Sequence, residues 1–161
     1  MILPIYIYGH PVLRKESQDI NADYPGLKEL IDNMFETLTE SDGVGLAAPQ
    51  VGLNIRLAVI DLDVLSEEYP EYKDFRRAYI NPHIVEVDDS EVVSMEEGCL
   101  SIPGIHESVK RATRIHVKYM DATSMSTTSG LRVTWPVLCS TSLIISTQRC
   151  LSTVCRLCAV S

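Results

Sequence analysis

The chain has 161 residues, of which 45% are hydrophobic and 22% charged, so its size and composition suit one soluble globular domain. Its formal net charge of −8 argues against a nucleic-acid-binding surface, because such surfaces need clustered Lys and Arg. No apolar stretch approaches the length of a membrane span, and residues 1–5 lack a basic leader, so we expect a cytoplasmic protein without a membrane partner.

In chain order, the first predicted element is an extended strap or loop at residues 10–14, because the residue before a proline is kept out of helical geometry. A helix is predicted at about residues 26–40, with Asn21 and Asp23 as candidate N-terminal caps and the Asp-Gly pair at 42–43 as its stop. The apolar residues of this helix recur at spacings of three and four: Leu27, Leu30, Ile31, Met34, Phe35 and Leu38.

Residues 43–50, Gly-Val-Gly-Leu-Ala-Ala-Pro-Gln, should form no long regular element, since they contain two glycines and a proline. Taken alone, this segment is equally consistent with a close-packed turn and with a functional backbone site. It does not resemble a phosphate loop, because it has no Gly-Lys-Ser/Thr and follows a helix instead of a strand.

The next segments have the composition of short strands separated by turns. We predict strands at residues 56–61, 78–81, 84–87, 91–95 and 114–119, with a polar and aromatic loop at 66–77. The predicted fold class is therefore α+β, with a mostly antiparallel sheet around a helix.

Cys99 is the one cysteine in the first 121 residues, and a turn-rich stretch follows it. A lone cysteine of this kind can be a small buried apolar residue, a thiolate that binds a metal, or a nucleophile. The last two need a neighbour that stabilises the thiolate charge. The residues themselves leave these alternatives open.

Glu96-Glu97-Gly98-Cys99-Leu100-Ser101, taken with residues 43–50, resembles two signature motifs of the peptide deformylases, and the resemblance covers about residues 3–121. It implies a metal-dependent amide hydrolase that removes the formyl group from N-formylmethionyl peptides, which are nascent chains at the ribosome. By the same resemblance, Cys99 would bind Fe²⁺, or Ni²⁺, Co²⁺ or Zn²⁺ in its place. The remaining implied roles are oxyanion binding by Gln50 and the Leu100 backbone N–H, peptide binding by Val44, Gly45 and Gly104, and support of the metal site by Glu97.

The third motif of that family, an H-E-x-x-H on a C-terminal helix, supplies two metal ligands and the general base, and this chain lacks it. No two of the histidines have that spacing on a helix, and each is predicted to lie in a turn or strand: His10, His83, His106 and His116. We therefore expect weak metal binding and little activity. The alternatives are a non-catalytic peptide-binding pseudoenzyme, and a cysteine-rich metal-binding or redox protein that uses Cys155 and Cys158 of a C-x-x-C together with Cys150.

The composition changes abruptly after Asp121. Residues 1–121 hold all 22 acidic residues and 11 of the 14 basic ones, whereas residues 122–161 carry a charge of +3 and four of the five cysteines. Residues 138–146 are compatible with codons that, shifted by two bases, read Met-Gln-His-Glu-Phe-Asp-His-Leu, which contains the missing motif. We therefore predict an incomplete deformylase-like domain at 1–121 and an out-of-frame tail at 122–161, in which the C-terminal helix is lost or replaced.

Overall fold

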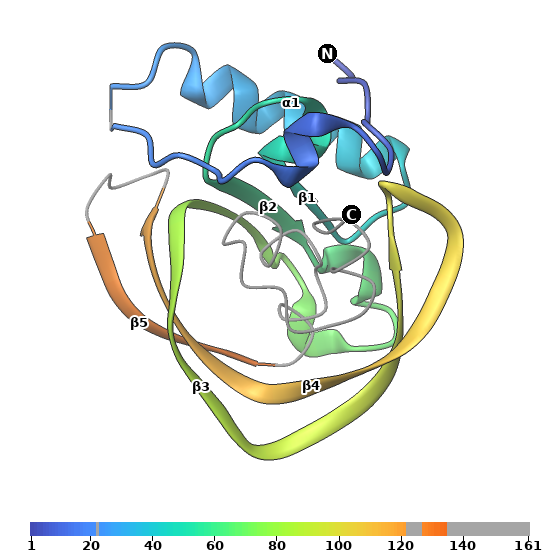
Figure 1. Ribbon diagram of the computed structural model, residues 1–161. Helices are drawn as coiled ribbons and strands as arrows, with labels where there is room; N and C mark the ends of the chain where they lie inside the picture. The colour runs from blue at the N-terminus through green and yellow to red at the C-terminus, as the bar shows by residue number, and fades with distance from the viewer. Residues whose placement is uncertain (22, 122–126, 135–161) are drawn as a thin grey trace.

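The computed structural model describes residues 1–21, 23–121 and 127–134, which form one α-helix and a five-stranded antiparallel sheet (Figure 1). Each strand pairs with the next along the chain, in the order β1-β2-β3-β4-β5. The elements are α1 (Leu27–Glu40), β1 (Gly45–Ala47), β2 (Leu57–Asp61), β3 (Arg76–Cys99), β4 (Ile102–Asp121), β5 (Thr127–Thr134) and the 3₁₀ helices η1 (Pro11–Arg14), η2 (Ala48–Val51), η3 (Asp63–Leu65) and η4 (Pro70–Tyr72). This architecture confirms the predicted α+β class.

Helix α1 begins and ends close to its predicted limits, but the candidate N-terminal caps, Asn21 and Asp23, are wrong. The N-cap is Gly26, whose φ of 70° is left-handed and which has no side chain to accept a capping bond. Asn21 instead accepts a backbone bond from Tyr24 in the turn before the helix. At the other end, Asp42 also has a left-handed φ, of 51°, which turns the chain towards β1.

Strand β2 is buried along its whole length, because both faces of the sheet are covered there. Leu57 and Val59 face a core that includes Met34 and Leu38 of α1. Ile60 faces a second apolar cluster, whose other buried members are Leu62, Tyr79, Ile84, Ile115, Val117 and Tyr119. Because successive side chains of β2 point to opposite faces of the sheet, this one strand contributes to both apolar cores.

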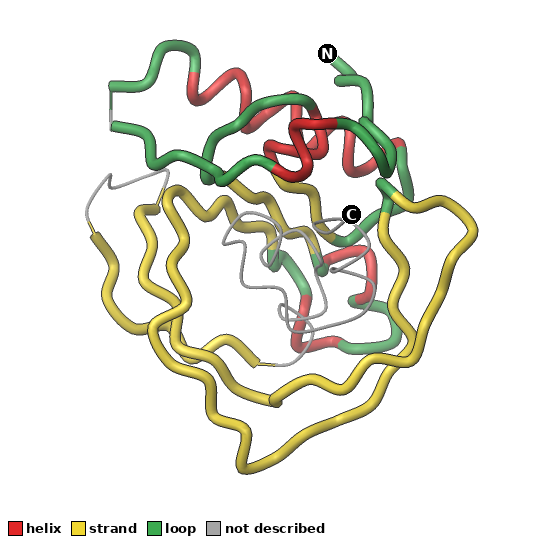
Figure 2. The backbone as a smooth tube through the Cα atoms, in the orientation of Figure 1, coloured by secondary structure: helices red, strands yellow, loops and turns green. Residues whose placement is uncertain are grey.

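Strands β3 and β4 form a long, curved hairpin that bows away from α1 in the tube view of Figure 2. The separate strands predicted at 78–81, 84–87 and 91–95 are one strand, whose pairing with β4 shifts register at four points along its length. Such bulges let a strand continue past residues that break the regular pattern. Residues 102–113, which were not predicted as a strand, form the first part of β4.

The N-terminal segment (residues 1–20) crosses the other elements and is bonded to several of them. Backbone N–H groups of Leu3, Tyr6 and Tyr8 donate to Thr37 Oγ1 (2.8 Å), the Gln50 carbonyl (2.8 Å) and the Ser101 carbonyl (2.7 Å). The same segment therefore contacts α1, η2 and the turn between β3 and β4.

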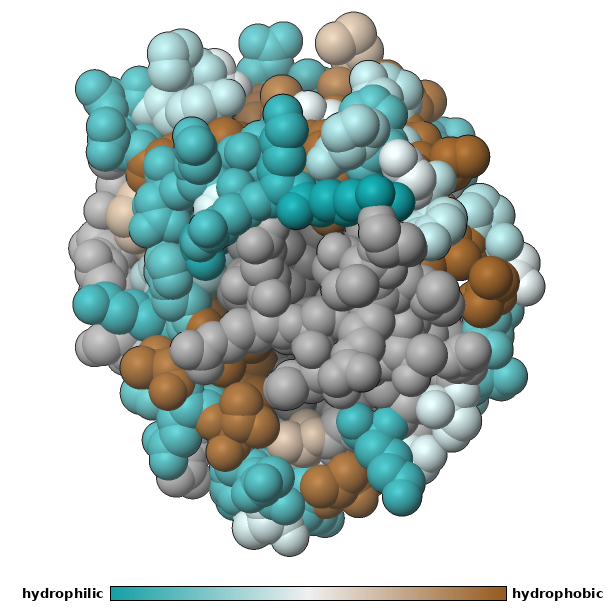
Figure 3. All heavy atoms as spheres, viewed as in Figure 1, coloured by the Kyte–Doolittle hydropathy of each residue, from teal (hydrophilic) through white to brown (hydrophobic). Residues whose placement is uncertain are grey.

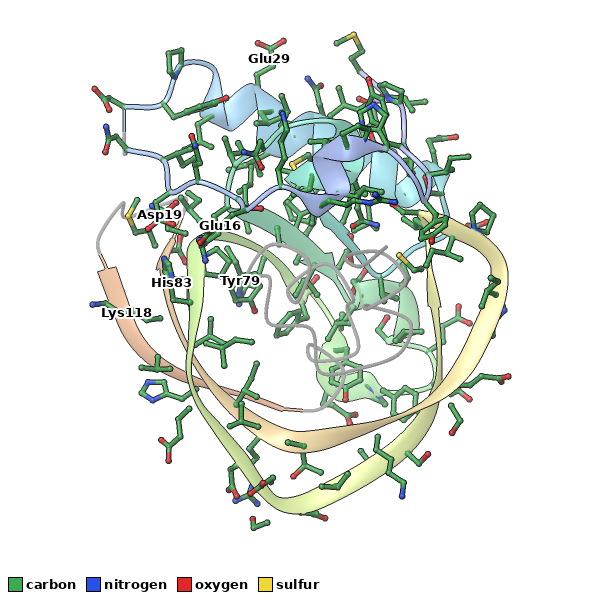
Figure 4. The ribbon with its side chains drawn as sticks, viewed as in Figure 1. Glu16, Asp19, Glu29, Tyr79, His83 and Lys118 are labelled. Carbon is green, nitrogen blue, oxygen red and sulfur yellow. The ribbon has the colours of Figure 1, made fainter. Side chains whose placement is uncertain are left out.

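Further along, the N-terminal segment is fixed to β3 and the residue before β2. The Asn81 side chain accepts from the Ile20 N–H (2.8 Å) and donates to its carbonyl (2.7 Å). Asp19 lies between Arg56 (2.8 Å) and His83 (2.9 Å), and the side chains of Asp19 and His83 are labelled beside β3 in Figure 4.

On the face drawn in Figure 3, the described apolar side chains lie singly or in small groups between hydrophilic ones. None of the helices among the described residues has the length and apolar character needed to cross a bilayer. The predicted tail comprises residues 122–161, of which only those of β5 are described. The predicted loss or replacement of the C-terminal helix and the C-x-x-C therefore concern residues outside the described part.

Candidate functional site

A pocket of about 480 Å³ opens where the turn after α1, η2 and the turn between β3 and β4 meet. It brings together the two segments that sequence reasoning singled out, although they lie about fifty residues apart in the chain. Of the candidate site residues, Val44, Gly45, Gln50, Cys99, Leu100 and Gly104 all line it. The side chain of Glu97 lies outside the described part of the chain, so its predicted supporting role is not placed.

Leu100 and Ser101 form a two-residue turn, because Cys99 at the end of β3 pairs with Ile102 at the start of β4. This turn packs closely against the end of α1. A Cβ atom on Gly43 would lie 2.9 Å from both Leu100 Cδ1 and Leu38 Cδ1, so a side chain at that position would have to displace the ends of these two leucines. The two segments of the pocket are thus in direct contact.

The orientation of the Gln50 amide is determined by its neighbours. Its Oε1 accepts from the Ala47 backbone N–H at 2.9 Å, and because an N–H can only donate, the Nε2 end must point the other way. Nε2 donates to Ser101 Oγ at 3.3 Å and lies 3.8 Å from Cys99 Sγ. Gln50 is 1% exposed, so this amide is held in a buried position next to the sulfur.

Cys99 is a buried residue, 8% exposed, at the inner end of the pocket, and its sulfur is a thiol and not part of a disulfide. Among the described residues, no three His, Cys, Asp or Glu side chains are grouped so that they could hold a metal ion. Of the histidines, His106 lines the pocket, whereas His10 accepts a bond from the Val12 N–H and His83 pairs with Asp19. The described residues therefore do not fit the three-ligand metal site that the resemblance implies.

Sequence reasoning missed three residues that support the site. Ser101 is fully buried and accepts the bond from Gln50, while the backbone of Tyr6 and Tyr8 holds the carbonyls of Gln50 and Ser101. The Ser101 position follows directly from the motif, but its partner is visible only in three dimensions. The tyrosines act through backbone groups, which every residue type carries, so no sequence signal marks them.

Comparison with known proteins gives a consistent result. The family model described as "Polypeptide deformylase" matches residues 2–131. A peptide deformylase from Salinibacter ruber is 47% identical over an alignment of 125 residues that covers 75% of this chain and 64% of that protein. The chain thus spans less than two-thirds of that relative's length.

Solved structures show the same likeness in three dimensions. The crystal structure of a peptide deformylase from Thermotoga maritima superimposes with a TM-score of 0.76 at 34% identity, covering 91% of this chain and 92% of that one. A Met-Ala-Ser-bound peptide deformylase from Acinetobacter baumannii gives a TM-score of 0.76 at 28% identity, covering 91% and 94%.

Proposed function

Since the chain belongs to the polypeptide deformylase family, we propose that its described part forms the peptide-binding groove of a peptide deformylase, the enzyme that hydrolyses the N-formyl group of formylmethionyl nascent peptides. We further propose that the chain as printed is inactive. The proposal of a peptide-binding groove rests on one observation: both motif segments line the same pocket, which has a buried amide, that of Gln50, and a buried thiol, that of Cys99, at its inner end.

Within this proposal, each pocket residue has a role suited to its chemistry. The Gln50 amide and the Leu100 backbone N–H would donate to a negatively charged oxygen, since both are neutral donors beside the reacting end of the pocket. Val44, Gly45 and Gly104 would lie along the peptide, and Glu97 would support the metal site. Cys99 would be a metal ligand, for Fe²⁺, Ni²⁺, Co²⁺ or Zn²⁺, and a single thiolate would hold such an ion only weakly.

We propose a shift of reading frame between about Ala122 and Thr128 as the reason for the missing ligands. Three observations support it: the family model matches only as far as residue 131, all the acidic residues lie in the first 121 positions, and the shifted reading of residues 138–146 contains His-Glu-Phe-Asp-His. The boundary between an incomplete domain at 1–121 and an aberrant tail at 122–161 belongs to the same proposal. So does a cytoplasmic location with nascent chains as partners.

The groove is tested by titrating ¹⁵N-labelled protein with Met-Ala-Ser amide and following backbone resonances. We expect shifts at the pocket residues Val44, Gly45, Leu100 and Gly104 and none at Val85, which is 58% exposed on β3 away from the pocket. Unchanged pocket resonances at millimolar peptide would contradict the groove.

Activity is tested on two chains, the one printed here and one in which the residues after Ala122 follow the shifted frame. Formate release from formyl-Met-Ala-Ser is expected only from the second. If the peptide binds to both chains but neither releases formate, the pseudoenzyme alternative is correct. If the printed chain instead binds one zinc ion through its tail cysteines and no peptide, the metal-binding or redox alternative replaces our proposal.

A further inference from the structure

Part of the N-terminal segment is bonded to η2 and also to the turn between β3 and β4, and it is drawn in dark blue beside that turn in Figure 1. The Tyr6 N–H donates to the Gln50 carbonyl at 2.8 Å, and the Tyr8 N–H donates to the Ser101 carbonyl at 2.7 Å. This bridging segment, residues 6–10, therefore holds the main chain of both segments that form the inner end of the pocket.

The Tyr6 ring gives the bridging segment a second contact with η2. Gly52 caps η2 with a left-handed φ of 89°, and a Cβ atom there would lie 2.6 Å from Tyr6 Cε2 and 3.2 Å from Tyr6 Cζ. The centroid of the His10 ring lies 4.3 Å from that of Tyr6. Tyr6 thus contacts η2 through its backbone at Gln50 and through its ring at Gly52.

The bonds of the bridging segment are shorter than the direct bond between the two pocket segments. Gln50 Nε2 lies 3.3 Å from Ser101 Oγ, slightly beyond the usual range for N–H···O bonds, whereas the two backbone bonds measure 2.8 and 2.7 Å. The packing of Leu100 and Leu38 at Gly43 joins the β3–β4 turn to α1 and not to η2. Since η2 has only four residues, its position depends on contacts of this kind.

The spacing of the two donors limits the spacing of their acceptors. Tyr6 and Tyr8 are two positions apart, so their nitrogen atoms are separated by at most about 7 Å of chain. They hold the carbonyl groups of Gln50 and Ser101, which are 51 positions apart in the sequence. A displacement of about 1 Å at a reacting group can lower turnover by about 10²-fold, so this spacing matters if the Gln50 amide takes part in the reaction.

We infer that Tyr6 and Tyr8 are positioning residues for the proposed deformylase reaction, because their backbone N–H groups and the Tyr6 ring keep the Gln50 amide in place beside Cys99. The inference rests on the proposed function, since it takes Gln50 to be the donor to an oxyanion. Neither tyrosine is among the described residues that line the pocket, so their loss should affect turnover and leave peptide binding nearly unchanged.

The test replaces Tyr6 or Tyr8 by the corresponding α-hydroxy acid, which keeps the side chain but removes the N–H by changing the amide to an ester. The same replacement at Tyr72 is the matched control, since its N–H donates to the Tyr69 carbonyl at 3.0 Å and neither residue lines the pocket. In the ¹⁵N-labelled chain as printed, the Gln50 side-chain amide resonances should shift in the first two esters and not in the control. The urea midpoint should fall in all three, because each loses one backbone bond.

In the frame-restored chain, the Tyr6 and Tyr8 esters should lower kcat for formyl-Met-Ala-Ser by about 10- to 100-fold, with KM changed by less than about twofold. Beside Gln50→Ala, the Tyr6 ester should lower kcat no further, because both changes act on the same amide. Tyr6→Phe keeps the ring and the N–H and should behave as the unchanged chain does. Should an ester fail to fold, Tyr6→Ala removes only the ring contact and should lower kcat to a smaller extent.

Unchanged Gln50 resonances or an unchanged kcat in both esters would overturn the positioning role while the groove stands. So would a further fall in kcat beside Gln50→Ala, or an equal fall in the Tyr72 control. If the unmodified frame-restored chain releases no formate, the proposed function fails, and the Gln50 resonances of the printed chain alone decide whether the bridging segment holds this amide.

Discussion

Gln50 is the residue whose surroundings bear most directly on the proposed oxyanion-binding role. Both ends of its amide are bonded, and Nε2 is directed towards Ser101 and Cys99. If this amide binds an oxyanion, Gln50→Ala in the frame-restored chain should lower kcat by roughly 10²-fold or more while the affinity for Met-Ala-Ser changes little. Steady-state formate release and peptide titration measure the two quantities, and an unchanged kcat would remove Gln50 from that role.

Ser101 should contribute to stability through the same amide. Its hydroxyl is fully buried, so Ser101→Ala leaves one Gln50 N–H without its oxygen acceptor, a loss expected to cost about 1–3 kcal/mol. The matched control is Ser94→Ala, which removes an exposed serine whose hydroxyl pairs with Ser108 at 2.8 Å, and should cost less than about 0.5 kcal/mol. Urea unfolding of both variants measures the difference, and equal costs would show that Ser101 does not position Gln50.

Tyr79 should make stability depend on pH in the alkaline range. Its ring is buried, its hydroxyl has no hydrogen-bond partner among the described residues, and its ring centroid lies 4.7 Å from that of Tyr119. Burial, with a smaller contribution from Tyr119, raises the pKa of Tyr79. Above the unfolded pKa of about 10, the unfolded chain loses this proton while the folded chain keeps it, so stability is retained below pH 10 and falls as pH rises above it.

The Tyr79→Phe variant should therefore lose part of that alkaline slope. Urea midpoints measured between pH 8 and pH 11 check this expectation. Tyr119, whose pKa burial also raises, keeps the remainder of the slope in the variant. The same slope in both proteins would mean that Tyr79 is solvated in the folded state.

At the scale of elements, the sequence predicted what depends on local pattern. The helix at 26–40 was found because six apolar residues share one face, and β2 because Leu57, Val59 and Ile60 belong to a continuous apolar run. The length of the β3–β4 hairpin was missed, since its bulges break the alternation and Pro103 and Gly104 suggest a loop. Both lie in the bulge between the Cys99–Ile102 and Gly98–His106 pairs, and the pairing with β3 on either side of the bulge, which no window of sequence contains, keeps them within the strand.

Prediction of the candidate site had the same limits. Seven candidate site residues could be named from the sequence, and all of them except Glu97 line the pocket, but the roles assigned to them remain proposals. The bond between Gln50 and Ser101, and the packing of His106 on Gly98, depend on the exact register of β3 with β4. Such contacts follow from tertiary structure and could not have been predicted from composition or spacing.

Asn81 allows the attachment of the N-terminal segment to be tested. It has a left-handed φ of 50° and makes two bonds to the backbone of Ile20. Asn81→Ala should destabilise the protein by about 2–4 kcal/mol, since it loses both bonds and strains the backbone. Asn81→Gly removes the bonds without the strain and should cost less; urea unfolding and hydrogen exchange of the Ile20 amide measure both effects, and a cost below 0.5 kcal/mol for Asn81→Ala would contradict them.

At the scale of the whole molecule, the composition of residues 122–161 bears on stability. Pro136 and the Ser- and Thr-rich run at 140–147 are unsuited to a helix, whereas the shifted reading has the pattern of an amphipathic one. A helix that covers several hundred Å² of apolar surface contributes at about 25 cal/mol per Å², which is comparable with the net stability of a domain. The printed chain should therefore be less stable and more prone to association than the frame-restored one.

Size-exclusion chromatography with light scattering and thermal unfolding compare the two chains at equal concentration. We expect the restored chain to be monomeric and to unfold cooperatively at a higher temperature. Residues 1–121 are common to both chains, and the described core within them serves as the internal reference in hydrogen exchange. A printed chain that is monomeric, unfolds cooperatively and protects its tail amides would show that the tail replaces the helix.

The bonds of the N-terminal segment have a consequence for the order of assembly during synthesis. Tyr8 donates to Ser101, which the ribosome adds 93 residues later, whereas every pair of neighbouring strands is also adjacent in the chain. The part of the molecule that is translated first is thus among the last to reach its final contacts. Until the β3–β4 turn has emerged and closed, the N-terminal segment has no complete site to occupy, and a nascent chain stalled before Ser101 should leave it open to proteases.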